Sequence, residues 1–197
     1  MSGLPLTKKA IVRPERSRDR ARIEELLDLC FGADRLKKTA YRFREQVEPV
    51  VELSYVVAYE DETGSELDVA ATIRYWPLLL PDDTPGLLLG PIAVDPALRN
   101  EGIGEGLMHF TLAQARAMGY ASVILVGDAP YYQRFGFSRD VTLGLEMPGW
   151  VEESRFLGLE WVEGALLNQK GLLRKWPKGR LLPHYSKGQK TTNPVRS

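Results

Sequence analysis

Residues 88–104 read LLGPIAVDPALRNEGIG, an apolar run followed by a proline and then by closely spaced glycines. Gly102, Gly104 and Gly106 fall where the pattern predicts the start of a helix, although each glycine costs a helix up to about 1 kcal/mol relative to alanine. The first N–H groups of a helix have no partner within it, and that end carries partial positive charge. A glycine-rich turn into a helix therefore predicts a phosphate-binding backbone. The alternative is that the glycines let the helix pack closely on a neighbour.

Two common phosphate-binding motifs do not fit this segment. The three glycines give G-x-G-x-G, whereas the dinucleotide fingerprint requires G-x-G-x-x-G, and the G-K-[ST] of a P-loop is missing. The segment R-x-x-G-x-G that begins at Arg99 is weak evidence by itself. Its meaning depends on the segments that surround it.

The surrounding sequence predicts an α/β fold with a mixed sheet. We expect strands at 10–13, 54–60, 68–76, 86–94, 122–126, 141–146 and 155–161, and helices at 17–31, 36–47, 102–118 and 129–135. The turn DETGSE between two of these strands indicates a hairpin. The helix at 102–118 joins two almost wholly apolar strands, which predicts a parallel pair with a right-handed crossover.

Composition excludes several classes of protein. The 26 basic and 26 acidic residues balance, so nothing in the net charge points to nucleic acid. No apolar run approaches the roughly 20 residues of a membrane span, and the first residues lack the pattern of a signal peptide. Cys30 is the single cysteine, and with only two histidines a metal site is not expected. We therefore expect a cytoplasmic protein without membrane partner or metal.

Charge is concentrated at the end of the chain. Residues 164–197 contain eight lysines and arginines and no acid. We expect a domain over 1–175 and a basic, flexible tail over 176–197, because the last stretch is polar and aperiodic. A solubilising tail is the favoured reading, and an RNA- or protein-binding module that uses this tail is the alternative.

The segment IAVDPALRNEGIG is followed by VILVGD and then by YYQRFGF at 131–137, and this order resembles the GNAT superfamily of acyl-CoA-dependent N-acetyltransferases. The likeness is closest to a branch of predicted bacterial acetyltransferases, strongest over 86–137 and weaker over 10–175. It implies a mostly antiparallel sheet with a splayed central parallel pair. It also implies acetyl-CoA as co-substrate, a small-molecule or peptide amine as acceptor, direct transfer, and compatibility with a homodimer.

The resemblance also implies roles for individual residues. The backbone of Ile92, Ala93 and Val94 would pair with the pantetheine arm. The pyrophosphate would lie on the segment Arg99, Asn100, Glu101, Gly102, Ile103, Gly104 and Glu105. Tyr132 falls on the family's acid, which protonates the departing thiolate, and a phenol with a pKa near 10 stays protonated for that task. Its neighbour Tyr131 is expected to pack, although the two roles could be exchanged.

The general base and the acceptor are less well marked. Asp128, at the end of an apolar strand, is the first candidate for the base, Glu60 is the second, and a water chain is the alternative to both. Basic residues at 35–47 either favour an anionic acceptor or form a solvated face, and Tyr75 and Trp76 could form an aromatic wall. A non-catalytic acyl-CoA-binding or regulatory module of the same fold is the alternative function.

Overall fold

The computed structural model describes residues 9–61 and 63–182, which are built on one large sheet. Its seven strands follow the order β1-β2-β3-β4-β5-β7, with β9 paired to β3. They are β1 (Lys9–Pro14), β2 (Tyr55–Glu60), β3 (Glu66–Leu79), β4 (Pro85–Val94), β5 (Ser122–Val126), β7 (Phe156–Glu160) and β9 (Arg174–Lys175), while β6 (Leu145–Glu146) and β8 (Gly171–Leu172) form a separate pair. Within the large sheet the β4–β5 pair is parallel and its other pairs are antiparallel. The predicted mixed, mostly antiparallel sheet is confirmed.

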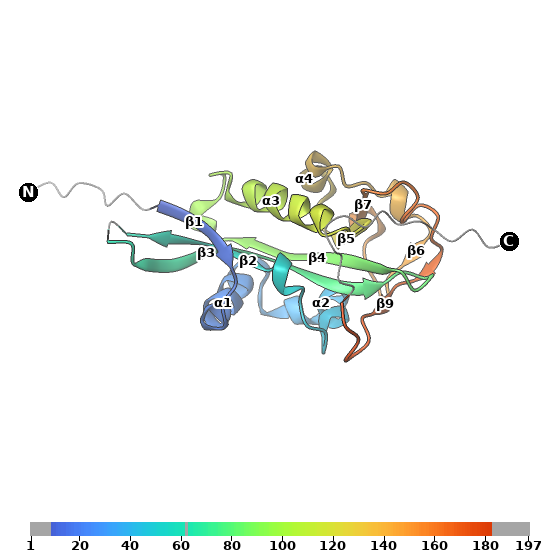
Figure 1. Cartoon of the computed structure of the whole chain (residues 1–197), viewed down its shortest axis with the longest axis horizontal. Coiled ribbons are helices and arrows are strands. Elements are labelled where there is room, and N and C mark those ends of the chain that lie inside the picture. The colour runs from blue at the N-terminus through green and yellow to red at the C-terminus, as the bar shows by residue number, and fades with distance from the viewer. Residues whose placement is uncertain (1–8, 62, 183–197) are drawn as a thin grey trace, which may run out of the picture.

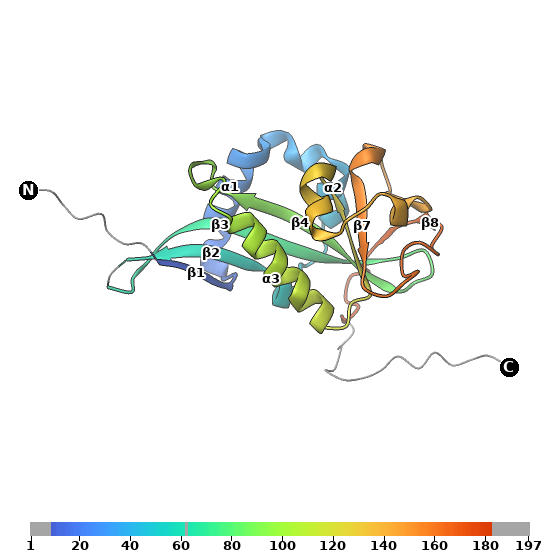
Figure 2. The same cartoon turned by 90° about the horizontal axis from the view of Figure 1, so that it is seen from above.

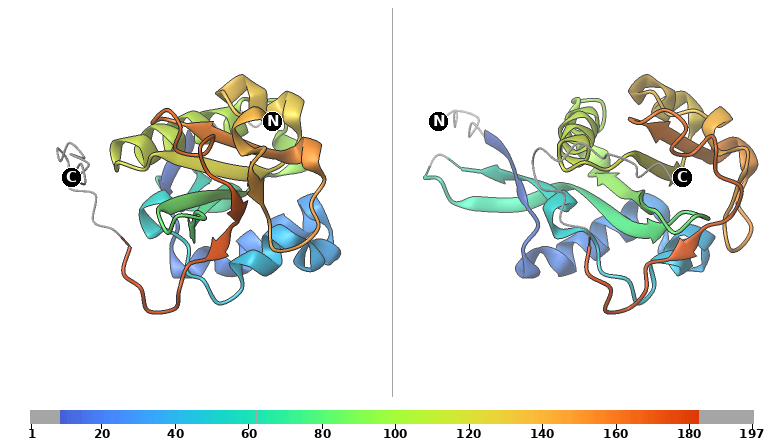
Figure 3. Two further views of the ribbon diagram at one scale, coloured as in Figure 1. Left: turned by 90° about the vertical axis from the view of Figure 1, so that its right-hand side faces the viewer. Right: turned by 45° about the vertical axis from the view of Figure 1, so that its right-hand side comes forward.

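Helices cover both faces of the sheet. Helices α1 (Arg20–Phe31) and α2 (Thr39–Arg44) lie on one face, and α3 (Ile103–Ala117) and α4 (Ala129–Tyr132) lie on the other (Figure 1). The two views of Figure 3 show the sheet between these two helical layers. Short 3-10 turns occupy Ser17–Asp19, Ala33–Lys37, Val51–Leu53, Pro96–Leu98, Gln133–Phe135, Asp140–Thr142 and Glu153–Arg155. No helix among the described residues is long and apolar enough to cross a membrane.

Alternation along the strands supplies both layers with apolar side chains. Val57 packs into the core beneath α3, with Leu107 and Met108. Its neighbour Val56 points the other way and packs with Ile23 of α1. The residues packed with Val57 and with Val56 are almost completely buried. Because side chains alternate along a strand, successive residues of β2 pack against helices on opposite faces of the sheet.

The parallel strands β4 and β5 separate soon after they meet. They pair only at Leu87–Val123 and Leu88–Ile124, while β4 continues to Val94. A register shift against β3 falls at Gly90, whose carbonyl accepts a hydrogen bond from Nε1 of Trp76 (2.8 Å). The splayed pair predicted by the family resemblance is therefore present, and its gap begins just before this irregularity.

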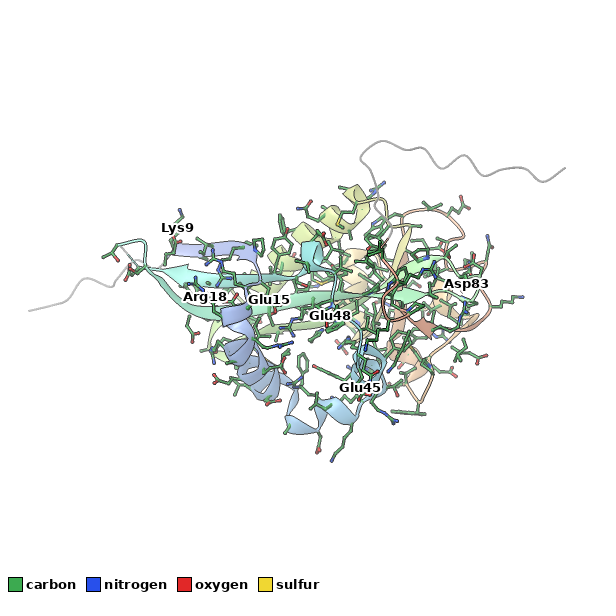
Figure 4. The ribbon with its side chains drawn as sticks, turned by 60° about the horizontal axis from the view of Figure 1, so that its bottom comes forward. Lys9, Glu15, Arg18, Glu45, Glu48 and Asp83 are labelled. Carbon is green, nitrogen blue, oxygen red and sulfur yellow. The ribbon has the colours of Figure 1, made fainter. Side chains whose placement is uncertain are left out.

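Buried arginines tie the N-terminal elements to the sheet. Arg74 of β3 binds Glu15 through two hydrogen bonds of 2.7 Å, and Arg35 binds Glu24 and Asp28 of α1. Figure 4 labels Glu15 beside the start of α1 and Glu45 directly after α2, on the same face of the sheet. Carboxylate partners offset the cost of burying these charges.

Two predicted elements differ from the structure. The helix expected at 36–47 is interrupted at Lys38, whose backbone is extended, because Arg35 is drawn toward the carboxylates of α1. The strand expected at 141–146 is reduced to β6, because a 3-10 turn occupies Asp140–Thr142.

The C-terminal segment packs further along the chain than predicted. Strands β8 and β9 were not expected, and Trp176 beyond them is only 7% exposed. The prediction of a loose tail that begins at residue 176 is therefore wrong for Trp176, whose side chain is buried. Residues 183–197 of the predicted tail lie outside the described residues.

Candidate active site

A cavity of about 920 Å³ lies where β4 and β5 separate. It is lined by residues 37–45 around α2, residues 89–92 of β4, residues 126–128 at the end of β5, Tyr132, and the loop 148–152. Helices α2 and α4 belong to opposite faces of the sheet, and α4 overlies the region of α2 when the molecule is seen from above (Figure 2). A cavity can reach both helices because the separated strands leave an opening in the sheet.

Tyr132 is held in the cavity by the turn from β5 into α4. Its N–H donates to the carbonyl of Asp128 (3.1 Å), and its ring packs edge-on against Tyr131 and Phe137. Gly127 leaves the space that the ring occupies, because a Cβ there would lie 2.1 Å from Cε2 of Tyr132. The glycine at this position therefore fixes where the phenol can lie.

The surroundings of Tyr132 favour its protonated form. Burial raises the pKa of Tyr132 well above its ordinary value, the neighbouring Tyr131 acts in the same direction, and the cations of Arg44 and Arg155 oppose the shift. A phenol in this setting carries its proton throughout the neutral range. It can therefore donate that proton to an anion formed in the cavity.

Tyr131 faces a different region. The lining of the cavity includes Tyr132 and does not include Tyr131. The hydroxyl of Tyr131 lies beside the first turn of α3, 3.2 Å from the position of a Cβ at Gly104, and Arg134 stacks over its ring at 4.7 Å. This placement agrees with a packing role for Tyr131.

Different physical reasons account for glycine at the three positions before and within α3. Gly102 has a left-handed backbone (φ 78°), as does Asn100 (φ 69°), and a Cβ at Gly102 would meet nothing within 4 Å. A Cβ at Gly104 would lie 3.3 Å from Cγ2 of Val94, so this glycine lets α3 approach β4. A Cβ at Gly106 would also meet nothing within 4 Å. Close packing therefore explains Gly104, and an open backbone is found at Gly102.

The N-terminus of α3 exposes free backbone donors. The first α3 hydrogen bond runs from the N–H of Gly106 to the carbonyl of Gly102 (2.9 Å). The N–H groups of Ile103, Gly104 and Glu105 therefore have no acceptor within the helix. This arrangement suits an anion, because the helix end is also partially positive.

The preceding loop is braced by α1 and ends with exposed side chains. Asp95 accepts a hydrogen bond from the N–H of Ala97 and forms an ion pair with Arg22 of α1. Arg99 and Glu101 are exposed at the end of this loop. The edge of β4 formed by Ile92, Ala93 and Val94 pairs with β3 on one side and lies beyond the last β5 pair on the other.

The candidate bases occupy different places. Asp128 lines the cavity together with Tyr132. Glu60 lies at the end of β2 opposite Lys9, outside the cavity lining. Tyr75 is fully buried with its hydroxyl bonded to Thr111 (2.8 Å), and Trp76 holds Gly90, so neither forms an acceptor wall.

Arg44 is a functional candidate that the sequence did not single out from its basic helix. It is 9% exposed, lines the cavity, and its Nε is without a hydrogen-bond partner among the described residues. Its distinction from Lys37, Lys38 and Arg42 is burial, which the local sequence does not reveal. Within the described part of the chain, no group of three or more His, Cys, Asp or Glu side chains could hold a metal ion.

Comparisons with known proteins agree with this geometry. Residues 20–137 match the model of the acetyltransferase (GNAT) family. The chain is 30% identical over 164 residues to the protein described as uncharacterized N-acetyltransferase YhbS of Escherichia coli K12, covering 83% of this chain and 94% of that protein.

Two solved structures are similar as well. The crystal structure of YhbS from Escherichia coli in complex with CoA has a TM-score of 0.69 and 26% identity, covering 89% of this chain and 93% of that one. A GNAT family acetyltransferase from Brucella melitensis in complex with acetyl-CoA has a TM-score of 0.55 and 26% identity, covering 78% and 88% respectively.

Proposed function

The chain belongs to the acetyltransferase (GNAT) family, and we propose that it moves an acetyl group from acetyl-CoA directly to a primary amine. The observation that carries this proposal is the protonated Tyr132 phenol, held in a cavity at the separation of β4 and β5. Two similar solved structures contain CoA or acetyl-CoA. A binding module without chemistry has no need for a buried proton donor at this place.

The co-substrate fits the free backbone groups of this part of the fold. We assign the pyrophosphate to the N–H groups of Ile103, Gly104 and Glu105, with Arg99, Asn100, Glu101 and Gly102 shaping the loop. The β4 edge at Ile92, Ala93 and Val94 would pair with the pantetheine arm. The thioester would then lie in the cavity that Tyr132 lines.

Two protons move in the transfer that we propose. The acceptor attacks as the free amine, and Asp128 takes the one proton that its nitrogen loses as the carbon–nitrogen bond forms, directly or through a water molecule. The amine nitrogen attacks the thioester carbon, and backbone N–H groups of the β4 edge stabilise the oxyanion. As the carbon–sulfur bond breaks, Tyr132 gives its proton to the leaving sulfur, and exchange with solvent returns both residues to their starting forms.

Calorimetric titration of the full chain with acetyl-CoA and with CoA tests the binding step. Gly104→Glu places a carboxylate among the free N–H groups and against Val94, so we expect this variant to lose binding. Gly106→Ala is the matched control, because its Cβ would meet nothing within 4 Å and should leave binding intact. Thermal unfolding of both variants establishes that they fold.

Release of CoA thiol in the presence of amines tests the chemical step. Amine-dependent thiol release by the wild type, lost in Tyr132→Phe while acetyl-CoA binding persists, is the result expected of an enzyme. Tight acetyl-CoA binding without thiol release for any amine would instead favour the regulatory module. No binding of acetyl-CoA by the folded wild type would overturn the proposal.

A further inference from the structure

Four arginines are buried among the described residues, and Arg44 differs from the other three. Arg13 is paired with Asp19, Arg35 with Glu24 and Asp28, and Arg74 with Glu15 and Glu24. No ion pair of a described carboxylate reaches Arg44, and its Nε has no hydrogen-bond partner among the described residues. A buried cation without a carboxylate partner costs stability, so an anion bound from outside the chain would stabilise it.

The guanidinium of Arg44 lies at the reacting end of the cavity. A Cβ added at Gly90 would be 3.2 Å from Nη2 of Arg44, which places this nitrogen against the irregularity of β4. Gly90, Arg44, Asp128 and Tyr132 all line the same cavity. Burial lowers the pKa of Arg44 to about 10, so the group is still a cation at neutral pH.

A second unpartnered donor lies beside it. The hydroxyl of Tyr41 is buried without a hydrogen-bond partner among the described residues, and its ring lies 5.0 Å from the Cζ of Arg44. Tyr41 also lines the cavity. A guanidinium can donate to two oxygens of one oxyanion, and the nearby hydroxyl can add a further hydrogen bond.

We propose that the acceptor amine carries its own oxyanion, a carboxylate or a phosphate, and that Arg44 and Tyr41 bind it. This inference rests on the proposed acyl transfer and names the class of acceptor. The lining of the cavity is consistent with it, because six lining residues are lysine or arginine and three are acids. The oxyanion takes the place of the missing counter-ion, and its binding leaves the amine near Tyr132 and Asp128.

Matched pairs of amines test the proposal on the full chain saturated with CoA. The pairs are glycine and glycinamide, 4-aminobutyrate and butylamine, and 2-aminoethyl phosphate and ethanolamine, each titrated by calorimetry. We expect at least one oxyanion-bearing member to bind about tenfold or more tightly than its partner without an oxyanion, as one charge-assisted hydrogen bond would give. The first two pairs test recognition of a carboxylate, and the third tests recognition of a phosphate.

Two variants assign this preference to Arg44. Arg44→Gln should reduce the affinity ratio of each amine pair to within about twofold, since the charge that binds the oxyanion is gone. Arg42→Gln is the control, because Arg42 lines the same cavity from the same helix but is exposed, and this variant should keep the preference. Absence of any anionic preference in the wild type, or its persistence in Arg44→Gln, would overturn the proposal.

Thiol release from acetyl-CoA with the same amines separates this inference from the function on which it rests. If Arg44 binds the acceptor, Arg44→Gln loses rate with amines that carry an oxyanion and keeps its rate with those that do not. An equal loss with amines that lack an oxyanion would mean that Arg44 acts on the thioester, and the inference would fail while the acetyltransferase stands. Anionic preference in binding without thiol release would support the oxyanion site and count against the acetyltransferase.

Discussion

Tyr131 and Tyr132 are neighbours in the chain, yet their hydroxyl groups belong to different parts of the molecule. Tyr132 lines the cavity, while the Tyr131 hydroxyl lies beside the first turn of α3. The difference follows from the turn after β5, where Gly127 leaves space for one ring only. The sequence assigned the acid to Tyr132 and left an exchange with Tyr131 open, and their placement supports the proposal that Tyr132 is the acid.

Replacing Tyr132 by phenylalanine keeps the ring and removes the acidic proton. We expect Tyr132→Phe to lower kcat by about 10²-fold to 10⁴-fold, the usual contribution of a general acid, with little change in acetyl-CoA affinity. Tyr131→Phe is the matched control and should stay within about threefold of the wild type. Steady-state thiol release and calorimetry check both variants. A loss confined to Tyr131→Phe would transfer the acid role to that residue.

The site residues that could be predicted from the sequence are those whose surroundings come from nearby residues in the chain. The glycines at 102–106 and the tyrosines at 131–132 each lie in a short continuous motif, so their surroundings could be predicted from adjacent residues. Arg44 resembles the other basic residues near α2 in sequence, but it is buried with its Nη2 against Gly90 of β4. Its burial depends on segments distant in sequence, which composition and periodicity do not report.

At the scale of elements, the entrance to α1 depends on one buried ion pair. Asp19 accepts two hydrogen bonds from the guanidinium of Arg13 in β1, at 2.6 and 2.8 Å, and a third from the N–H of Arg16 at 2.7 Å. These bonds connect β1 to the start of α1. Hydrogen bonding by Arg13 holds the pKa of Asp19 below its ordinary value.

The sign of this shift fixes a pH dependence of stability. A carboxyl whose pKa is lower in the folded state stabilises the protein above its unfolded pKa of 3.8, and this stabilisation is lost as pH falls through the folded value. We expect Asp19→Asn to lower the free energy of unfolding by about 3–5 kcal/mol at pH 7, because the buried guanidinium of Arg13 loses the negative charge of its Asp19 partner. Below pH 3.8 the difference from the wild type should shrink.

Urea unfolding at pH 7 and at pH 3 measures both effects. Asp34→Asn is the control, because the Asp34–Lys37 pair is exposed and such pairs contribute about 0–1 kcal/mol. A difference between Asp19→Asn and wild type that is unchanged at pH 3 would show that the ionised carboxylate is not the source of the stabilisation.

Strands and helices with their own apolar period were predicted well, and those that depend on partners were not. Helix α3 and strands β4 and β5 carry continuous apolar patterns, and their bounds agree with the prediction within a residue or two. Strands β8 and β9 have two residues each and exist through pairing with β6 and β3. Nothing in two residues specifies such a pairing.

At the scale of the whole molecule, the C-terminal segment supports the wall of the cavity. Strand β9 pairs with Leu78 and Leu79 of β3, and Leu173 packs in the same core as Phe43 of α2. The Nζ of Lys175 also donates to the carbonyl of Glu45, directly after α2. The chain directly before the predicted tail thus braces the helix that carries Arg44.

Trp176 gives the sharpest test of this arrangement. Its side chain is 7% exposed, its Nε1 donates to the carbonyl of Arg180 (2.8 Å), and the Arg180 guanidinium covers its ring at 4.7 Å. We expect Trp176→Ala to lower the free energy of unfolding by about 3–5 kcal/mol, as truncation of a buried aromatic does. Lys178→Ala, at an exposed position nearby, should stay within about 0.5 kcal/mol of the wild type.

Urea unfolding followed by circular dichroism compares the two variants on one scale. If the side chain of Trp176 anchors the adjacent strand β9, Trp176→Ala should also weaken binding in the cavity, because Lys175 of β9 donates to Glu45 directly after α2. A cost below about 1 kcal/mol would instead mean that the chain beyond β9 behaves as a surface segment, since exposed positions rarely cost more. In that case the predicted boundary after residue 175 would stand, and the bracing of α2 would rest on Leu173 and Lys175.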